Sequence, residues 1–394
     1  MTQSDQMAQT DMREAAEKLG RILKYLTSDP NNRELLATAI DLHLRAGQID
    51  DAWQRAKDAL ALYPDDPFFQ HRLGNVLIAM DSLEEAEMLF EQLRGKSSDS
   101  AIAYSLAYVY FCQRRYLKVR DVLLPYAGSP TDPIEESGKL SPAAVALLLR
   151  ALHHAGKVKD ALEVAKPYLA AWPGDPDILA VASLLYLDDG QMEEARRCSL
   201  AAQSAGVYPI EALVTGGTVA LGTGDVDAAN MQFSKALEMN PKDGRTWSGL
   251  GLSSMLNQDL VKATEQLEKA VAYMPEHIGT WQALGWCKLL GRDLAGAETL
   301  FRKALALDRN FAESYGCVAV VAALKGDVDI ANESIARAVR LNPSGMAAKY
   351  AQMVLSGEAQ DPAKIRALAL QLFSTGQGAV DQNFAEIMAR ASKK

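Results

Sequence analysis

The sequence has few cysteines, few aromatic residues and no excess of positive charge, and each shortage excludes a class of protein. The four cysteines stand far apart, so a zinc knuckle, a CxxC redox site and a disulfide framework are not indicated. The 41 Lys and Arg residues are outnumbered by 50 Asp and Glu residues, which gives a formal charge of −9. An acidic chain lacks the clustered cations that displace counterions from nucleic acid, so we expect no nucleic-acid partner.

Long apolar runs are missing as well. No stretch approaches the roughly 20 apolar residues of a membrane-spanning helix, so we expect no insertion into a membrane. Residues 1–10 are polar and lack the basic and then apolar order of a secretory signal, which predicts a cytoplasmic protein. With only 9 Phe among 394 residues, a hydrophobic content of 48% points to a core of Ala and Leu. Such a core suits closely packed helices and predicts an all-α fold.

Motifs that indicate catalysis or cofactor binding are absent too. The sequence contains no Gly-x-Ser-x-Gly, HExxH or Walker motif. The adjacent His153 and His154 point about 100° apart on a helix and have no third histidine nearby, which does not favour a metal site. The segment 114–120 alternates cations with Tyr116, but the run is single, so a solvated helix face is favoured. We therefore expect no enzyme, no cofactor and no metal.

One pattern is repeated three times between residues 244 and 343. Trp247, Trp281 and Tyr315 stand 34 residues apart, and a small residue follows each of them four positions later. A large and a small side chain at this spacing share one helix face, so we expect the ring to fill space beside the small residue. The second half of each copy carries an alanine at the same place, which is residue 263, 297 or 331. A period of 34 is typical of a repeated pair of helices.

This pattern resembles the tetratricopeptide repeat (TPR) family. The resemblance implies an all-α solenoid, a right-handed superhelix of about nine helix-turn-helix repeats with helical caps. One hairpin cannot bury its apolar stripe alone, whereas stacked copies can. Ser141-Pro142 and Asp175-Pro176 each predict a helix start, since proline is tolerated in the first turn after an N-cap.

The 34-residue frame divides the chain into five parts. An insertion with two prolines and two glycines interrupts the frame after the third repeat. The predicted parts are an N-terminal capping helix (1–31), an N-terminal block of three repeats (32–126), an inserted loop or hinge (127–141), a C-terminal block of six repeats (142–345) and a C-terminal helical cap (346–394).

In tetratricopeptide proteins the first helices of successive repeats line a concave groove that binds extended or helical peptides. The resemblance implies that the fifth and ninth residues of each first helix, with some neighbours, face the partner. The expected groove residues are Phe68, His71, Asn75, Tyr104, Tyr108, Phe111, Arg150, Leu184, Thr218, Leu252, Met255, Gln282, Trp286 and Leu289. The later ones form an apolar strip that suits an amphipathic segment, and the earlier ones offer mixed polar and aromatic contacts. In the alternative, Trp286 and Leu289 pack between repeats or under the C-terminal helices.

These features together predict a non-enzymatic scaffold that binds segments of partner proteins. Only His71-x-x-x-Asn75 matches part of the set with which some co-chaperones of the family hold a C-terminal carboxylate, so heat-shock protein tails are not expected. A narrower hypothesis is a chaperone or assembly factor of a bacterial secretion or pilus system. The alternative is a regulatory adaptor that presents a bound enzyme or transcription factor and uses 127–141 as a hinge. A third hypothesis places an enzymatic or nucleic-acid site on the C-terminal helices.

Overall fold

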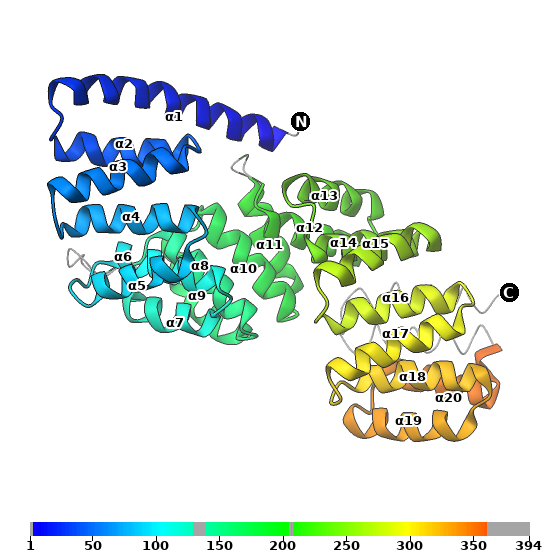
Figure 1. Cartoon of the computed structure of the whole chain (residues 1–394). Coiled ribbons are helices and arrows are strands. Elements are labelled where there is room, and N and C mark those ends of the chain that lie inside the picture. The colour runs from blue at the N-terminus through cyan, green and yellow to red at the C-terminus, as the bar shows by residue number, and fades with distance from the viewer. Residues whose placement is uncertain (1–2, 129–138, 205, 207, 361–394) are drawn as a thin grey trace. The chain divides into compact units, whose positions relative to one another are not determined.

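The computed structural model describes residues 3–128, 139–204, 206 and 208–360, and all regular structure in these ranges is helical. The helices, labelled in Figure 1, fall into two compact units, residues 1–189 and 190–394. The α-helices of unit 1 are α1 (Gln3–Ser28), α2 (Arg33–Arg45), α3 (Ile49–Leu62), α4 (Pro67–Ala79), α5 (Leu83–Arg94), α6 (Ser100–Cys112), α7 (Tyr116–Leu123), α8 (Pro142–His154), α9 (Val158–Ala171) and α10 (Pro176–Asp188). Those of unit 2 are α11 (Met192–Gln203), α12 (Ile210–Gly222), α13 (Val226–Met239), α14 (Gly244–Leu256), α15 (Leu260–Tyr273), α16 (Ile278–Leu290), α17 (Leu294–Leu307), α18 (Ala312–Lys325), α19 (Val328–Leu341) and α20 (Met346–Ser356).

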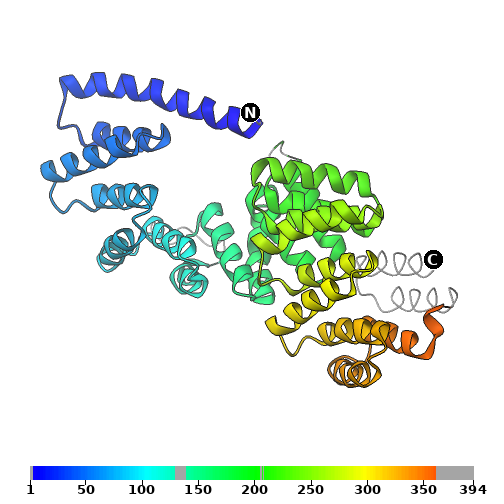
Figure 2. The ribbon, with the colours of Figure 1, turned by 45° about the vertical axis from the view of Figure 1, so that its right-hand side comes forward.

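Successive helices pack as antiparallel pairs, as the repeated pattern predicts. In unit 1 the pairs are α2–α3, α4–α5, α6–α7 and α8–α9, and α1 packs on α2 (Figure 2). In unit 2 they are α12–α13, α14–α15, α16–α17 and α18–α19, and α20 packs on α18. The expected fifth pair, α10 and α11, falls on either side of the boundary between the units. The all-α solenoid is therefore confirmed, and the number of nine repeats stays a prediction.

The first helix of most pairs begins at a side chain that caps its free amide groups. Asp66, Asp99 and Asp243 each accept a hydrogen bond from an amide in the first turn of the helix that follows. The two predicted starts are confirmed, since Ser141 and Asp175 accept from Ala144 N and Ile178 N and each is followed by a proline. These caps explain why a polar residue precedes most of the first helices, whereas α12 and α18 follow Pro209 and Phe311 and have no side-chain cap.

The small residue of each repeat lies against the second helix of its own pair. A Cβ atom added to Gly251 would lie 2.5 Å from Leu267 Cγ, and one added to Gly285 would lie 2.4 Å from Phe301 Cε1. Leu267 and Phe301 are fully buried. The space beside each glycine is thus filled by a side chain of the second helix. From the sequence we had expected Trp247 and Trp281 to fill it. The recurring alanines 263, 297 and 331 are fully buried in the second helices.

In two of the copies the repeated aromatic residue is instead hydrogen-bonded to the turn before its helix. Trp247 Nε1 donates to the carbonyl of Pro241 and Trp281 Nε1 donates to that of Pro275, both over 2.8 Å. A cation from the second helix covers each ring. The three cation and ring pairs are Lys269 over Trp247, Lys303 over Trp281 and Arg337 over Tyr315, at 4.1, 5.9 and 5.2 Å from the ring centroid.

The predicted insertion lies inside unit 1. Residues 129–138 of it are outside the described residues, so its role as a hinge stays a prediction. The helices on its two sides share one hydrophobic core, to which Val119 and Leu123 of α7 and Leu148 of α8 belong. Of the predicted C-terminal cap, α20 and the short 3₁₀ helix Glu358–Gln360 are described. Among the described residues, no helix combines the length and the apolar character that crossing a bilayer requires.

Candidate partner-binding surface on the first helices of unit 1

The predicted groove residues separate by burial, and the late apolar strip is not an open surface. Four of them are at most 9% exposed, namely Leu184 (7%), Met255 (3%), Gln282 (9%) and Trp286 (6%). A partner cannot reach a buried side chain unless the surrounding helices separate. The expectation that these four contact a partner is therefore corrected: they pack inside their own units.

Trp286 is buried because three neighbouring helices surround it. Its ring meets that of Phe301 in α17 edge to face, with centroids 5.6 Å apart, and lies 6.4 Å from the ring of Tyr350 in α20. One turn earlier, Gln282 Nε2 donates to Ser314 Oγ in α18 over 3.1 Å. Both side chains join α16 to the helices that follow it. This is the packing alternative that the sequence left open for Trp286.

The other predicted residues of unit 2 are partly buried. Leu252 and Leu289 pack against the core cluster that contains Met255 and Trp286. Thr218 Oγ1 donates to Val214 O of its own helix over 2.9 Å. Unit 2 therefore presents little of the expected groove chemistry.

Unit 1 keeps most of its predicted residues accessible, on the first helices α4, α6 and α8. Tyr108 is 40% exposed, and the rest are partly exposed. We call this surface the unit 1 face, and its residues are Phe68, His71, Asn75, Tyr104, Tyr108 and Arg150. The first helices also touch one another, so these side chains form one continuous region.

Phe68 lies at one end of the unit 1 face, between two guanidinium groups. The Cζ atoms of Arg33 and Arg72 lie 4.1 and 3.8 Å from the ring centroid. Each cation also has a carboxylate partner: Arg33 Nε donates to Asp66 over 2.8 Å and Arg72 Nη2 donates to Asp41 over 2.9 Å. The hydrogen bond from Arg33 lowers the pKa of Asp66. Glu34 also lies 3.4 Å from Arg33, so the ring is held between two cations that both have carboxylate partners.

The sequence did not indicate this network around Phe68. Arg33 and Asp66 are 33 residues apart, and Arg72 and Asp41 are 31 apart, so each pair joins neighbouring repeats. The one available signal is the repeat period itself, which places residues about 34 apart side by side.

A chain of polar side chains crosses from α4 to α6 in the middle of the unit 1 face. Ser105 Oγ donates to Asn75 Oδ1 over 3.3 Å and lies 3.0 Å from His71 Nε2, so the imidazole N–H donates to the hydroxyl. Burial lowers the pKa of His71, which keeps its ring neutral at pH 7. In the part of the chain that the structure describes, the amide nitrogen of Asn75 has no partner and keeps its donors for a ligand.

Two tyrosines and an arginine complete the unit 1 face. Tyr104 and Tyr108 stand four residues apart on α6, and burial raises the pKa of both phenols, so both stay protonated. The Tyr108 hydroxyl bonds the thiol of Cys112 one turn on. Arg150 of α8 lies near Tyr104, and its Nη2 is 4.0 Å from Asp177 Oδ1 of α10. The region offers rings, amide and hydroxyl donors and the partly exposed guanidinium of Arg150.

Phe111 is the remaining predicted residue of unit 1, and it belongs to a packed aromatic cluster. Its ring lies 5.5 Å from that of Tyr116 and 5.7 Å from that of His154, which stacks on Tyr116 at 4.9 Å. The neighbouring His153 lies 2.6 Å from Asp188 through its Nε2 atom. Within the described ranges, no three His, Cys, Asp or Glu side chains gather closely enough to hold a metal ion.

A family model matches one part of this chain. The family model described as "Tetratricopeptide repeat" matches residues 214–277, from within α12 to the residue before α16. No curated protein sequence matches. A solved structure of an IFIT1 monomeric mutant with Gppp-AAAA is similar at a TM-score of 0.54 and 14% identity, over 96% of this chain and 94% of that one.

Two further solved structures are similar at lower scores. The Cut9–Hcn1 hetero-tetramer of APC/C matches at a TM-score of 0.48 and 12% identity, over 98% of this chain and 96% of that one. PilF of Pseudomonas aeruginosa matches at 0.42 and 17% identity, over 53% of this chain and 95% of that one. Identities this low show similarity of fold alone.

Proposed function

We propose that this tetratricopeptide-repeat protein is a non-enzymatic scaffold that binds segments of partner proteins on the unit 1 face. The repeat fold suggests a role in protein–protein interaction. The observation that carries the proposal is the contrast between the two units. Partly exposed aromatic and hydrogen-bonding side chains gather on α4, α6 and α8, whereas on α14 and α16 Met255, Gln282 and Trp286 are buried and only the aliphatic Leu252 and Leu289 remain partly exposed.

The chemistry of the unit 1 face suits an extended segment. Tyr104 and Tyr108 are large, have few rotatable bonds and are not ionised, which is the kind of side chain that dominates binding energy in interfaces. The unpartnered amide of Asn75 can donate to a carbonyl of the partner backbone. Arg150 is a partly exposed cation beside a phenol, and Asp177 lies 4.0 Å from its guanidinium. Because its neighbours already hold it, Phe68 needs no reordering on binding.

Two finer statements belong to this proposal. The first is a cytoplasmic location, in keeping with the acidic composition. The second is the pathway, for which we propose a chaperone or assembly factor of a bacterial secretion or pilus system. The identity of a captured partner tests both. A captured enzyme or transcription factor whose activity changes on binding would favour the adaptor alternative.

The experiment starts from affinity capture with the full chain and peptide mapping of the bound segment. Its dissociation constant is then measured for the wild type and for Tyr104→Ala, Tyr108→Ala and Tyr273→Ala. Tyr273 of α15 is the matched control, since it is 46% exposed but lies in unit 2. We expect a loss of about tenfold or more at positions 104 and 108 and none at 273. Equal affinities for all four correctly folded proteins would refute the proposal.

A further inference from the structure

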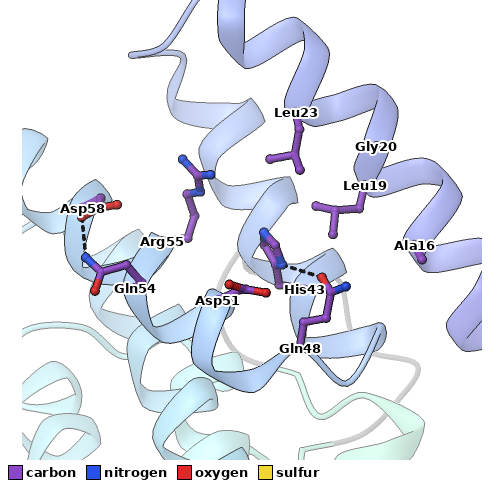
Figure 3. A pocket seen from close by; sticks show the side chains of 10 residues that line it. All are labelled: Ala16, Leu19, Gly20, Leu23, His43, Gln48, Asp51, Gln54, Arg55 and Asp58. Atoms are coloured by element: carbon purple, nitrogen blue, oxygen red, sulfur yellow. Dashed lines mark hydrogen bonds between the residues drawn. The ribbon is translucent and has the colours of Figure 1, made fainter.

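A second region of unit 1 has the form of a ligand site, and it lies away from the unit 1 face. It is a cleft of about 510 Å³ lined by α1 and α3, with the turn after α2 at its base (Figure 3). A cleft of this volume lies in the range of small-molecule sites. Helices α1 and α2 pack together and so do α2 and α3, which leaves α1 and α3 as opposite walls.

The α1 wall is apolar and has room. Its cleft residues are Ala16, Leu19, Gly20 and Leu23. A Cβ atom added to Gly20 would meet no atom within 4 Å, so this part of the wall opens on empty space. A hydrocarbon body placed here would remove apolar surface from water on both sides.

The opposite wall is polar and carries two carboxylates, Asp51 and Asp58, with Arg55 between them. Asp58 already accepts a hydrogen bond from Gln54 Nε2 over 2.9 Å. No partner of Asp51 or of Arg55 is found among the described residues. Asp51 therefore stands on the cleft wall as a carboxylate with free acceptor positions.

His43 lies at the base of the cleft and is hardly exposed. Figure 3 shows its ring beside Gln48, with Nδ1 2.9 Å from Gln48 Oε1. The accessible charge is therefore that of the polar wall, where Asp51 and Asp58 outnumber Arg55.

We propose that this cleft binds an ammonium or guanidinium group carried on an apolar stem, with the cation at Asp51 and the stem against Ala16 and Leu23. The same chemistry occurs in a free alkylamine and in a Lys or Arg side chain of a partner peptide. A variant of Arg55 distinguishes a bound cation from a bound anion, because the positive charge of Arg55 repels a cation and would attract an anion.

The test measures binding to the full chain by ligand-observed NMR, with two probes. One is hexylammonium, and the other is an acetylated and amidated peptide with a single Lys among alanines. We expect binding of at least one probe, and the one that binds more tightly identifies the source of the ligand. Asp51→Asn should weaken binding about tenfold, as expected for the loss of one charge-assisted hydrogen bond. Asp50→Asn is the matched control, since Asp50 lies in the same helical turn but outside the cleft.

Variants at Arg55 and at Gly20 test the charge of the cleft and its free volume separately. Arg55→Ala should tighten cation binding, and Gly20→Leu should abolish it by filling the cleft, while Gly20→Ala should change it little. Absence of binding by both probes would overturn the proposal. So would equal effects of the Asp51 and Asp50 variants, or loss of cation binding in Arg55→Ala. All these variants leave the unit 1 face intact, so failure here is distinct from failure of the proposed scaffold function.

Discussion

The same substitution, Gly→Ala, should have opposite effects on stability at two helical positions. In an exposed helix, Gly→Ala stabilises by about 1 kcal/mol because alanine loses less backbone entropy on folding. At Gly20 nothing lies within 4 Å of the new methyl group, so the whole gain should be observed. At Gly285 the methyl group would lie 2.4, 2.6 and 3.0 Å from three ring atoms of Phe301.

Phe301 cannot move away from that methyl group, because it is fully buried and its ring meets Trp286 edge to face. Overpacking of this kind costs about 1 to 3 kcal/mol, and contact with three ring atoms favours the upper end. Subtracting the gain of about 1 kcal/mol in helix propensity leaves Gly285→Ala destabilised by about 2 kcal/mol. Gly20→Ala should instead be more stable than the wild type.

The assay is urea unfolding of the full chain, followed by circular dichroism and by tryptophan fluorescence, since the two units need not unfold together. A second substitution tests the cause. Phe301→Leu shortens the side chain that the methyl group meets, so it should cost less in the Gly285→Ala background than in the wild type, a coupling that a double-mutant cycle measures. Equal stabilisation by both Gly→Ala variants, or no coupling to Phe301, would refute this packing argument.

Three further predictions concern other contacts. Trp247→Phe keeps a ring beneath Lys269 but loses the hydrogen bond to Pro241, so urea unfolding should show a loss of about 0.5 to 1 kcal/mol. The folded-state pKa of Asp66 is lowered, so the contribution of its carboxylate to stability should be present above about pH 4 and should disappear as the pH falls further. Unfolding measured between pH 2 and pH 5 should show this loss in the wild type and a smaller loss in Asp66→Asn. With a thiol reagent, native protein should react first at Cys112, because the other three cysteines are buried. Burial raises the pKa of the Cys112 thiol too, but it raises that of Cys287 to about 12. Cys112→Ser should lack this first reaction, and equally fast labelling of all four cysteines would contradict the structure.

The repeat period predicted the fold because it reports a property of every copy. Spacing of 34 residues, capping residues such as Asp175 and the alanines of the second helices all follow from how one hairpin packs on the next. These contacts are local or join adjacent repeats, so one sequence shows them.

The candidate site was harder to predict, because burial depends on what covers a residue. The ninth position of a first helix is partly exposed as Asn75 in α4 but buried as Trp286 in α16, where Phe301 and Tyr350 surround the ring. The period identified both as groove positions and could not tell them apart. In the same way, the network around Phe68 depends on the rotamers of two arginines, which no spacing rule fixes.

The most direct test of the proposed function is to replace Tyr108 and, separately, Tyr273 by a photo-crosslinking amino acid and to irradiate each protein with the captured partner. If segments of the partner bind the unit 1 face, the crosslink should form from position 108 and map to the segment found by peptide scanning. A crosslink from position 273 with none from position 108 would contradict it.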